Sequence, residues 1–530
     1  MKRRWIVAAC AAAAALLAAG CSSGSGSSSA STAAGGYVSG GTFTMDISSD
    51  PGTVSPYQST EGSARQIYAF GYDTLLGKTS SGTEVPELAT KWTATLHQVT
   101  FTLHKSVKCD DGSTLTASDV AADFNSIKNP KTLSPWLSFT IPVSYTVSSN
   151  NQAGTVTITT AKPDGLLAAG AGELPIVCPA GLSSPDSIAH KFDGTGPFQI
   201  TSYSPNNSYT MTVRKGYDWG PNGASTSAAG TPAKVVLDFV DDETTEANQL
   251  LAGDINAAQV SGSDATRLTG LKTATITTLA GELYFNEASG QLLADKDLRT
   301  ALAEAIDIPD VTKVGTGGLG KVATNMEVET PPPCPGDTTS ALPAYNVSAA
   351  KALLQSDGWV MGSGGIREKD GKKLAISLPY QTGSEQTVDA VELIAQEWKA
   401  IGVQVSLPGY EEAQWTQMLT VTGNFNVFYS SINLDSPFQY SDFFGGPSPS
   451  DGGDNFGHID NSQFDSLSAQ ALGTSGSAGC TLWNDAQKAL MARADVIPIS
   501  VLPDPFYLHD ATMEAVGVLE VPSSIRLLAS

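Results

Sequence analysis

Alternating apolar and polar positions in the first part of the chain predict strands that are buried on one face. The alternation covers residues 43–47, 99–103 and 156–158, where Thr or Asp separates the apolar residues. Thr116, followed three residues later by Asp119, has the form of a capping box and predicts that a helix begins there. The first half of the chain should therefore mix sheet and helix.

The second part of the chain predicts helices and one complete strand-helix-strand unit. Apolar residues recur at helical spacing over 298–306 and again over 350–354. Residues 374–378 then alternate, residues 388–398 place their apolar side chains on one helical face, and residues 403–407 alternate again. Two strands joined by a helix are parallel, so we expect a parallel α/β layer in this part of the protein.

The N-terminus has the layout of an export signal that ends at a cysteine. Lys2, Arg3 and Arg4 precede an apolar run over 5–19, which is short for a membrane span, and small residues lead into Cys21. We therefore expect residues 1–20 to be a signal peptide and Cys21 to carry a lipid. An ordinary signal peptide with an incidental cysteine is the alternative. The Arg3-Arg4 pair also leaves twin-arginine export open.

Residues 22–36 predict a flexible tether. They contain only Ser, Gly, Ala and Thr, and cannot bury enough apolar surface to fold alone. Fifteen such residues span roughly 20 Å as a random coil. Residues 21–36 would then hold a globular body close to the outer face of the cell membrane, with two acyl chains as the anchor.

Composition indicates a globular body that does not bind nucleic acid. The 494 residues from 37 to 530 suffice for two or three compact units, and 41% of the chain is hydrophobic. The net charge is -23, and it becomes about -26 when Lys2, Arg3 and Arg4 leave with the signal peptide. Such a charge repels nucleic acid and anionic lipid headgroups.

No motif in the chain indicates a catalytic or metal centre. Residues 315–320 match G-x-G-x-x-G, but they follow a helical pattern and do not open a helix, so a dinucleotide site is not indicated. The five histidines are scattered, and no C-x-x-C spacing or nucleophile elbow is present. Cys109, Cys178, Cys334 and Cys480 remain in an exported chain, where four cysteines allow three disulfide connectivities. We expect no cofactor and no enzymatic activity.

Nine segments, in order along nearly the whole mature chain, resemble the family 5 solute-binding proteins of ABC importers, the oligopeptide and dipeptide class. Each segment is weakly specific alone, and the resemblance rests on their common order. They are residues 37–57, 71–78, 85–92, 99–120, 194–198, 209–219, 283–289, 295–307 and 497–503.

The resemblance implies a two-lobed α/β fold of the periplasmic-binding-protein type, with mixed sheets and an extra subdomain in the N-terminal lobe. Lobe one would comprise residues 37–281 and 502–530, and lobe two residues 282–501, with hinge crossings near residues 285 and 500. These boundaries favour disulfides between Cys109 and Cys178 and between Cys334 and Cys480, because each pair then lies in one lobe.

The family also implies a monomeric, extracytoplasmic binding protein that closes around its ligand and is recognised by an ABC permease. In peptide-binding relatives the main chain of the ligand is hydrogen-bonded, and an Asp of lobe two meets its ammonium group. Here Asn433 occupies the position of that Asp, and an amide gives no charge-assisted bond to an ammonium. Asp435 could replace it, or could be a solvated turn residue.

The remaining candidate ligand residues are Ser430 and Ser431, in the same segment, and Trp415, which matches a family tryptophan of the ligand cleft. Trp415 could equally belong to the core. The ligand classes left open are peptides, oligosaccharides or other uncharged solutes, and nickel complexes. A secreted hydrolase is the competing class, and no pair of nucleophile and base supports it.

Overall fold

The computed structural model describes residues 31–32, 36–130, 134–137, 141, 144–327, 332–431, 434 and 437–529. The expected signal peptide and Cys21 lie outside these residues, as does most of the expected tether. Ser31–Thr32 is a short strand, β1, that pairs with β2 (Val38–Ser39). This end of the expected tether therefore takes part in a sheet, because backbone pairing needs no apolar side chain. In the described part of the chain, no helix has the length and hydropathy of a membrane span.

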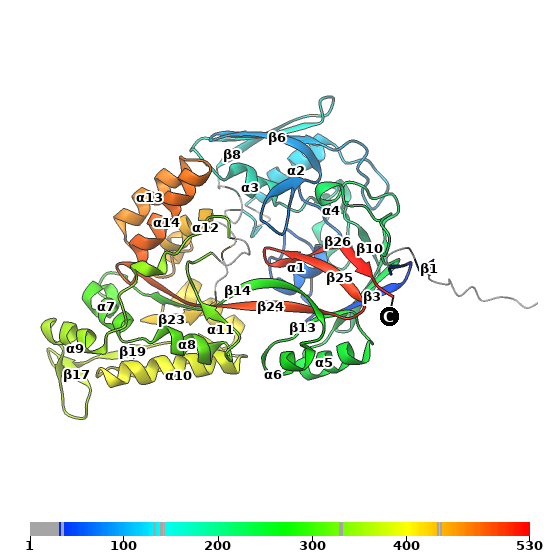
Figure 1. Ribbon diagram of the computed structural model, residues 1–530. Coiled ribbons are helices and arrows are strands. Elements are labelled where there is room, and N and C mark those ends of the chain that lie inside the picture. Colours follow the sequence, from blue (N-terminus) through cyan, green and yellow to red (C-terminus); the bar gives the residue numbers. More distant parts are fainter. Residues whose placement is uncertain are drawn as a thin grey trace, which may run out of the picture.

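One large mixed sheet runs through the whole molecule (Figure 1). Its strands, in spatial order, are β10 (Phe198–Ser204), β11 (Ser208–Val213), β12 (Lys234–Phe239), β3 (Thr42–Ile47), β13 (Ala257–Gln259), β24 (Val496–Leu508), β14 (Lys272–Phe285), β23 (Val427–Ser430), β20 (Tyr380–Gln381) and β22 (Gly409–Tyr410), with β15 (Lys321–Val322) also paired to β24. Both parallel and antiparallel pairs occur, which confirms the expected mixed sheet.

The two long central strands, β14 and β24, are shared by both halves of the molecule. They pair antiparallel from Lys272 opposite Leu508 to Tyr284 opposite Val496. At one end β24 pairs with β13, and at the other end β14 pairs with β23. The hydrophobic core divides at these strands: one cluster takes its residues from 43–276 and 506–527, and two others take theirs from 283–499. The expected lobe boundaries, after 281 and after 501, fall between these cores.

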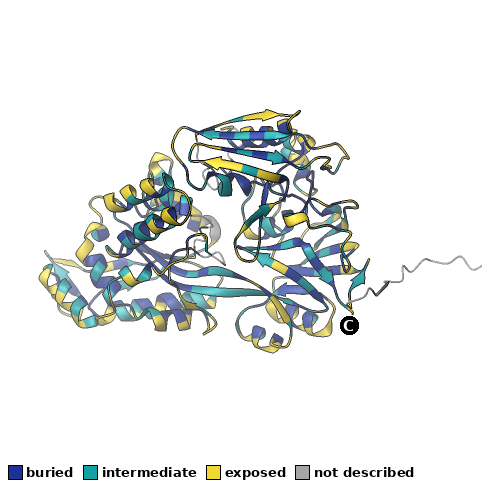
Figure 2. Ribbon diagram, turned by 45° about the horizontal axis from the view of Figure 1, so that its top comes forward, coloured by how far each residue is buried: buried dark blue, intermediate teal, exposed yellow. Residues whose placement is uncertain are grey.

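The first lobe carries a separate four-stranded sheet that matches the expected extra subdomain. Its order is β6 (Ala89–Thr95), β7 (Gln98–Leu103), β9 (Thr155–Thr160) and β8 (Tyr145–Asn150), and Figure 2 shows exposed residues along its outer strands. Helix α2 (Ala117–Ile127) packs on it and begins with the predicted capping box of Thr116 and Asp119. The alternation predicted over 99–103 and 156–158 is confirmed as β7 and β9, and that over 43–47 as β3.

Other first-lobe elements pack around these sheets. The helices are α1 (Gly62–Tyr68), α3 (Leu167–Gly172), α4 (Pro179–Ser183), α5 (Glu243–Ala252) and α6 (Gly262–Ala265). Two hairpins, β4 (Leu76–Lys78) with β5 (Glu84–Pro86) and β25 (Ala511–Val516) with β26 (Leu519–Leu527), complete the lobe.

The second lobe contains the predicted strand-helix-strand unit. Strands β19 (Ala375–Ser377) and β21 (Gln404–Ser406) are parallel and joined through α10 (Glu385–Ala400). They form a two-stranded sheet of their own instead of joining the main one. The other helices of the lobe are α7 (Lys296–Glu304), α8 (Ile308–Gly315), α9 (Val347–Ser356), α11 (Glu412–Gln417), α12 (Pro437–Phe444), α13 (Ser462–Leu472) and α14 (Ser477–Met491). A small antiparallel sheet of three strands, β16 (Val360–Met361), β17 (Arg367–Lys369) and β18 (Lys372–Lys373), also belongs to this lobe.

The structure contains two disulfides, Cys109 to Cys178 and Cys334 to Cys480, which is the pairing expected from the lobe boundaries. The first joins two segments of lobe one and the second joins two segments of lobe two. Neither crosses between the lobes, so neither restricts a relative movement of the two bodies.

Candidate functional site

Strand β14 borders cavities on both sides of the lobe boundary. Ile276 and Thr278 line a cavity of about 420 Å³ on the first-lobe side, and Ala280 lines one of about 210 Å³ on the second-lobe side. The pairing of β14 with β24 shifts register between Leu279 and Gly281, so the alternation of faces along β14 is interrupted between the two cavities. Asp504 of β24, the sheet partner of Ile276, also borders the first-lobe cavity. The two cavities thus lie along the same crossing strand, one in each lobe, and we take them together as the candidate site.

Polar side chains form the first-lobe wall of this site. The Gln66 amide donates to Gln259 Oε1 at 2.6 Å, and the Gln259 amide donates to Asp504 Oδ2 at 3.0 Å. Burial, and then the charge of Glu243, raise the pKa of Asp504 to about 6. Glu61 is committed to the fold, because its carboxylate accepts the first backbone N–H groups of α1. This wall can accept and donate hydrogen bonds through its amides, and the Arg65 side chain also borders the cavity.

Hydroxyl groups dominate the second-lobe wall. The residues around this cavity are Ala280, Gln381, Thr382, Gly383, Ser384, Thr387, Tyr429, Ser430 and Ser431. Ser384 caps α10 by accepting the backbone N–H of Thr387 at 3.2 Å, and the Tyr429 hydroxyl donates to the Ala280 carbonyl at 3.2 Å. Among the described residues, this lining contains no carboxylate and no basic side chain. It suits a polar, uncharged part of a ligand, and it includes the two predicted residues Ser430 and Ser431.

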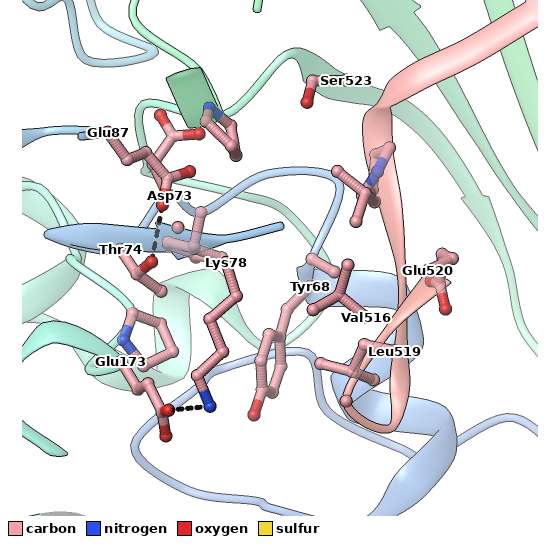
Figure 3. Close-up of a pocket in the computed structure, with 18 of the residues that line it drawn as sticks. Tyr68, Asp73, Thr74, Lys78, Glu87, Glu173, Val516, Leu519, Glu520 and Ser523 are labelled. Carbon is pink, nitrogen blue, oxygen red and sulfur yellow. Dashed lines mark hydrogen bonds and ion pairs between the residues drawn. The ribbon is translucent and has the colours of Figure 1, made fainter. Parts of the chain in front are cut away.

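A side cavity of about 210 Å³ opens beside the first-lobe wall, between the start of β4 and the β25–β26 hairpin. Arg65, Val518 and Leu519 border both this cavity and the first-lobe cavity, so the two adjoin. Figure 3 shows Tyr68 and Lys78 on one side and Val516 and Leu519 on the other. Its walls combine apolar and aromatic side chains with charged ones, including the ion pair of Lys78 and Glu173, and could take a ligand side chain.

Two buried carboxyls lie at the inner end of the side cavity. Asp73 accepts hydrogen bonds from Thr195, Tyr217 and Trp219, at 2.7, 2.8 and 3.0 Å. Glu87 accepts from the Thr74 hydroxyl at 2.6 Å. Burial, and then the charge of Asp73, raise the pKa of Glu87 well above its usual value. Because the Asp73 carboxylate already accepts three hydrogen bonds from its own lobe, we assign Asp73 and Glu87 a structural role and not a ligand-binding one.

The other predicted site residues divide into one that is buried and two that lie outside the described residues. Trp415 on α11 is 5% exposed and packs edge-on against Phe428, with ring centroids 5.6 Å apart. It does not line any of the three cavities above. Asn433 and Asp435 are among the residues that the structure does not describe, so their roles stay predictions.

Glu282 is a buried carboxyl on β14, at the second-lobe end of the strand. It is 1% exposed, and the Tyr284 hydroxyl donates to its Oε2. Burial raises its pKa to about 8, an effect that the hydrogen bond from Tyr284 reduces. Burial similarly raises the pKa of Glu246 and of Glu520 to about 8. Near neutral pH these three carboxyl groups are therefore largely protonated in the folded protein, whereas they are ionised in the unfolded chain.

We expect the free energy of unfolding to fall as the pH rises from about 5 to about 8, and Glu282→Gln to reduce that fall. A protonated Glu282 stabilises the fold fully below its unfolded pKa of 4.5, and the contribution is lost as the pH approaches 8. A fully buried group changes the free energy by about 1.4 kcal/mol per pH unit in this window. Urea denaturation at several pH values measures how the free energy of unfolding changes with pH.

Glu392→Gln, at an exposed position, is the control and should leave this pH dependence unchanged. The same pH dependence for wild type and Glu282→Gln would contradict the assignment to Glu282.

No group of three or more His, Cys, Asp or Glu side chains within the described segments is arranged to hold a metal ion. A metal would therefore need ligands from the solute it arrives with, or from other residues.

Comparison with known proteins identifies the family. The family described as bacterial extracellular solute-binding proteins, family 5 Middle, matches residues 83–453, more than half of the chain. Protein XP55 of Streptomyces lividans is 26% identical over 400 residues, which cover 71% of this chain and 68% of that protein. The oligopeptide-binding protein OppA of Lactococcus lactis subsp. cremoris is 24% identical over 420 residues, which cover 69% of this chain and 67% of that protein.

Two solved structures show the same fold at low sequence identity. AppA from Bacillus subtilis, in complex with a nonapeptide, superimposes with a TM-score of 0.72 at 20% identity and covers 92% of this chain and 99% of its own. NikA from Brucella suis, in complex with Fe(III)-EDTA, gives a TM-score of 0.74 at 20% identity, with the same coverage of both chains. These matches confirm the two-lobed α/β fold expected from the sequence. The chain belongs to the family 5 extracellular solute-binding proteins, which bind solutes for transporters and are not enzymes.

Proposed function

We propose that this protein captures oligopeptides or dipeptides between its two lobes and delivers them to the membrane permease of an ABC importer. The chain is a family 5 solute-binding protein, and its relatives and structural neighbours include an oligopeptide-binding protein and one in complex with Ni(L-His). The observation that carries the proposal is that residues of β14 border a cavity in each lobe, Ile276 and Thr278 in the first and Ala280 in the second. A ligand in contact with both walls favours the closed arrangement, which the permease would recognise.

The walls are suited to a peptide main chain. Amide and hydroxyl groups of Gln259, Thr278, Thr382 and Ser430 border the two cavities and can pair with backbone N–H and C=O groups. Such contacts give affinity with little dependence on ligand sequence. We propose that Asn433, at the family position of the anchoring Asp, makes a free peptide N-terminus less important here than in peptide-binding relatives.

An uncharged solute such as an oligosaccharide is the second candidate. The observation that favours it is the hydroxyl-rich second-lobe wall, whose described residues carry no charged side chain. A nickel complex is the third, and it would have to bring its own metal ligands, given the absence of a metal-holding cluster among the described residues.

Titration calorimetry separates these candidates. We expect tetra-alanine to bind, and its N-acetylated form to bind with less than a hundredfold loss. Heat from maltotriose without heat from either peptide would replace the peptide proposal by the sugar one. A loss of a hundredfold or more on acetylation would show that an ammonium anchor exists, with Asp435 as the first candidate. Mass spectrometry of solutes that copurify from the native host would then identify the ligand.

We also propose that the protein is a lipoprotein on the outer face of the cell membrane, anchored through Cys21 and tethered by the Ser/Gly-rich residues between Cys21 and β1. The support is the sequence alone: a basic start, an apolar run and small residues before the cysteine. Mass spectrometry of the N-terminal peptide tests it, since the lipid mass must lie on Cys21.

A further inference from the structure

The lobes touch at a second place, far from the crossing strands. The loop after β9, residues 162–166 of lobe one, meets the turn between α13 and α14, residues 473–476 of lobe two. In Figure 1 this turn lies beside the β6–β9 sheet, at the opposite end of the lobe boundary from β14 and β24. We name these two segments the distal contact.

A backbone hydrogen bond and one apolar side chain form the distal contact. The Gly165 N–H donates to the Leu472 carbonyl at 2.6 Å. Leu166, although it belongs to lobe one, packs against the hydrophobic cluster of lobe two that includes Leu472 and Phe464. Lys162 is also close enough to lobe two for its charge to act on Asp442. Burial raises the pKa of Asp442 to about 6, and the charge of Lys162 opposes that rise.

Gly165 is the point of closest approach. A Cβ added there would lie 2.4 Å from the Thr474 carbonyl oxygen and 3.4 Å from Ser475 Cα. The three nearest atoms all belong to lobe two, and none belongs to the lobe that carries Gly165. Its φ lies outside the left-handed region, so its own lobe gives no backbone reason for a glycine. A side chain at position 165 would therefore clash only when the two lobes are in contact.

Each side of the contact is held in shape by its own lobe. The Asp164 N–H donates to the Leu96 carbonyl at 2.7 Å, and the Asp164 carboxylate accepts the Leu166 N–H at 2.8 Å. In lobe two, a Cβ on Gly479 would lie 2.4 Å from the Thr474 carbonyl oxygen, so α14 packs directly on the turn. Neither segment can yield easily to an added methyl group.

We propose that the distal contact is a latch, made when the lobes close around a solute and broken when they open, and that Gly165 is required for it to form. The inference rests on the proposed function, in which closure accompanies binding. With β14 and β24 as the hinge at one end, a latch at the other end resists reopening and so slows ligand release. Its free energy is added only in the closed state, where it shifts the equilibrium toward closure.

Gly165→Ala should weaken binding without affecting the fold. The probe is a tryptic digest of casein, titrated against protein freed of copurified solutes by unfolding and refolding, with tryptophan fluorescence as the readout. We expect the apparent affinity to fall at least tenfold and the dissociation rate to rise, with an unchanged melting temperature for the ligand-free protein. Gly270→Ala is the matched control, because no atom lies within 4 Å of its added Cβ. Equal affinities for wild type and Gly165→Ala, or a lowered melting temperature for ligand-free Gly165→Ala alone, would overturn the latch.

A second experiment decides the question without any ligand. Pro163 Cγ lies 3.9 Å from the position of a Cβ on Gly473, so Pro163→Cys with Gly473→Cys should form a disulfide across the contact. Hydrogen exchange of the Gly165 amide is then compared in the oxidised and the reduced forms. We expect exchange at least tenfold faster after reduction. Equal protection in both forms would mean a permanent contact, and failure to cross-link would mean that the contact does not form in solution. If casein peptides do not bind wild type at all, the peptide proposal fails while this comparison still decides the latch.

Discussion

Arg299→Met should lower the free energy of unfolding of the second lobe by about 3 to 5 kcal/mol, the cost of breaking a buried ion pair from one side. Arg299 on α7 is fully buried, and its Nη2 lies 2.7 Å from Asp495 Oδ1 and 2.9 Å from Glu287 Oε2. Its Nη1 also donates to the Leu293 carbonyl at 2.8 Å. The substitution removes the fully buried partner of two carboxyls and a carbonyl, and leaves the carboxyls only the more distant and partly exposed Arg493, with Asn461 still donating to Asp495. Urea denaturation followed by circular dichroism measures the loss.

A matched control isolates burial as the cause. Arg267 and Asp264 form an ion pair with the same 2.7 Å distance, but the Arg267 side chain is 39% exposed. Water already solvates both partners of an exposed pair, so Arg267→Met should change stability little. If Arg299→Met and Arg267→Met lower the free energy of unfolding equally, the buried ion pairs of Arg299 do not hold α7 to the crossing strands. Because Glu287 follows β14 and Asp495 precedes β24, Arg299 holds the second-lobe ends of both strands.

Local patterns predicted those elements whose burial repeats along the sequence. Strands β3, β7 and β9 alternate because each buries one face, and α2 begins at Thr116 because the capping box satisfies its first N–H groups. Strand β14 is different, since its last five residues are all buried and show no alternation. Its pairing with β24 spans more than two hundred residues of sequence. The crossings were expected only through the family resemblance.

Only part of the candidate site could be predicted from the sequence. Ser430 and Ser431 were expected and do line a cavity, because they continue a strand that the resemblance had placed. Gln66, Gln259 and Asp504 were missed, since they come from three distant segments and only the folded chain brings them together.

Trp415 illustrates a different limit. A large aromatic residue is equally at home in a core and in a ligand cleft, so the sequence left both open. Its 5% exposure and its contact with Phe428 favour the core. The distal contact was not expected at all, because a glycine required only by a partner across a lobe boundary has no local pattern.

The second-lobe disulfide fastens the helix on which the distal contact is built. Cys480 lies on α14, next to Gly479, against which the Thr474 carbonyl packs. The Cys334 N–H donates to Glu327 Oε2 at 2.7 Å, and the Asn484 amide donates to the Pro335 carbonyl at 3.1 Å. The bond to Cys334 therefore joins α14 to a segment that is itself hydrogen-bonded on both sides.

Removing this disulfide should destabilise the protein more than removing the other one. The chain-entropy cost grows with the loop that is closed, and the separations are 146 residues for Cys334–Cys480 and 69 for Cys109–Cys178. We expect about 5 kcal/mol for Cys334→Ala with Cys480→Ala, and about 4 kcal/mol for Cys109→Ala with Cys178→Ala. Thermal and urea unfolding of both double variants measures the difference, and peptide mapping without reductant verifies the pairing in the parent. A cross-linked peptide that joins Cys109 to Cys480, or a loss under about 1 kcal/mol for both variants, would refute the pairing or its role. Because the loosened α14 carries the turn of the distal contact, the Cys334→Ala, Cys480→Ala variant should also release bound solute faster than the first-lobe variant.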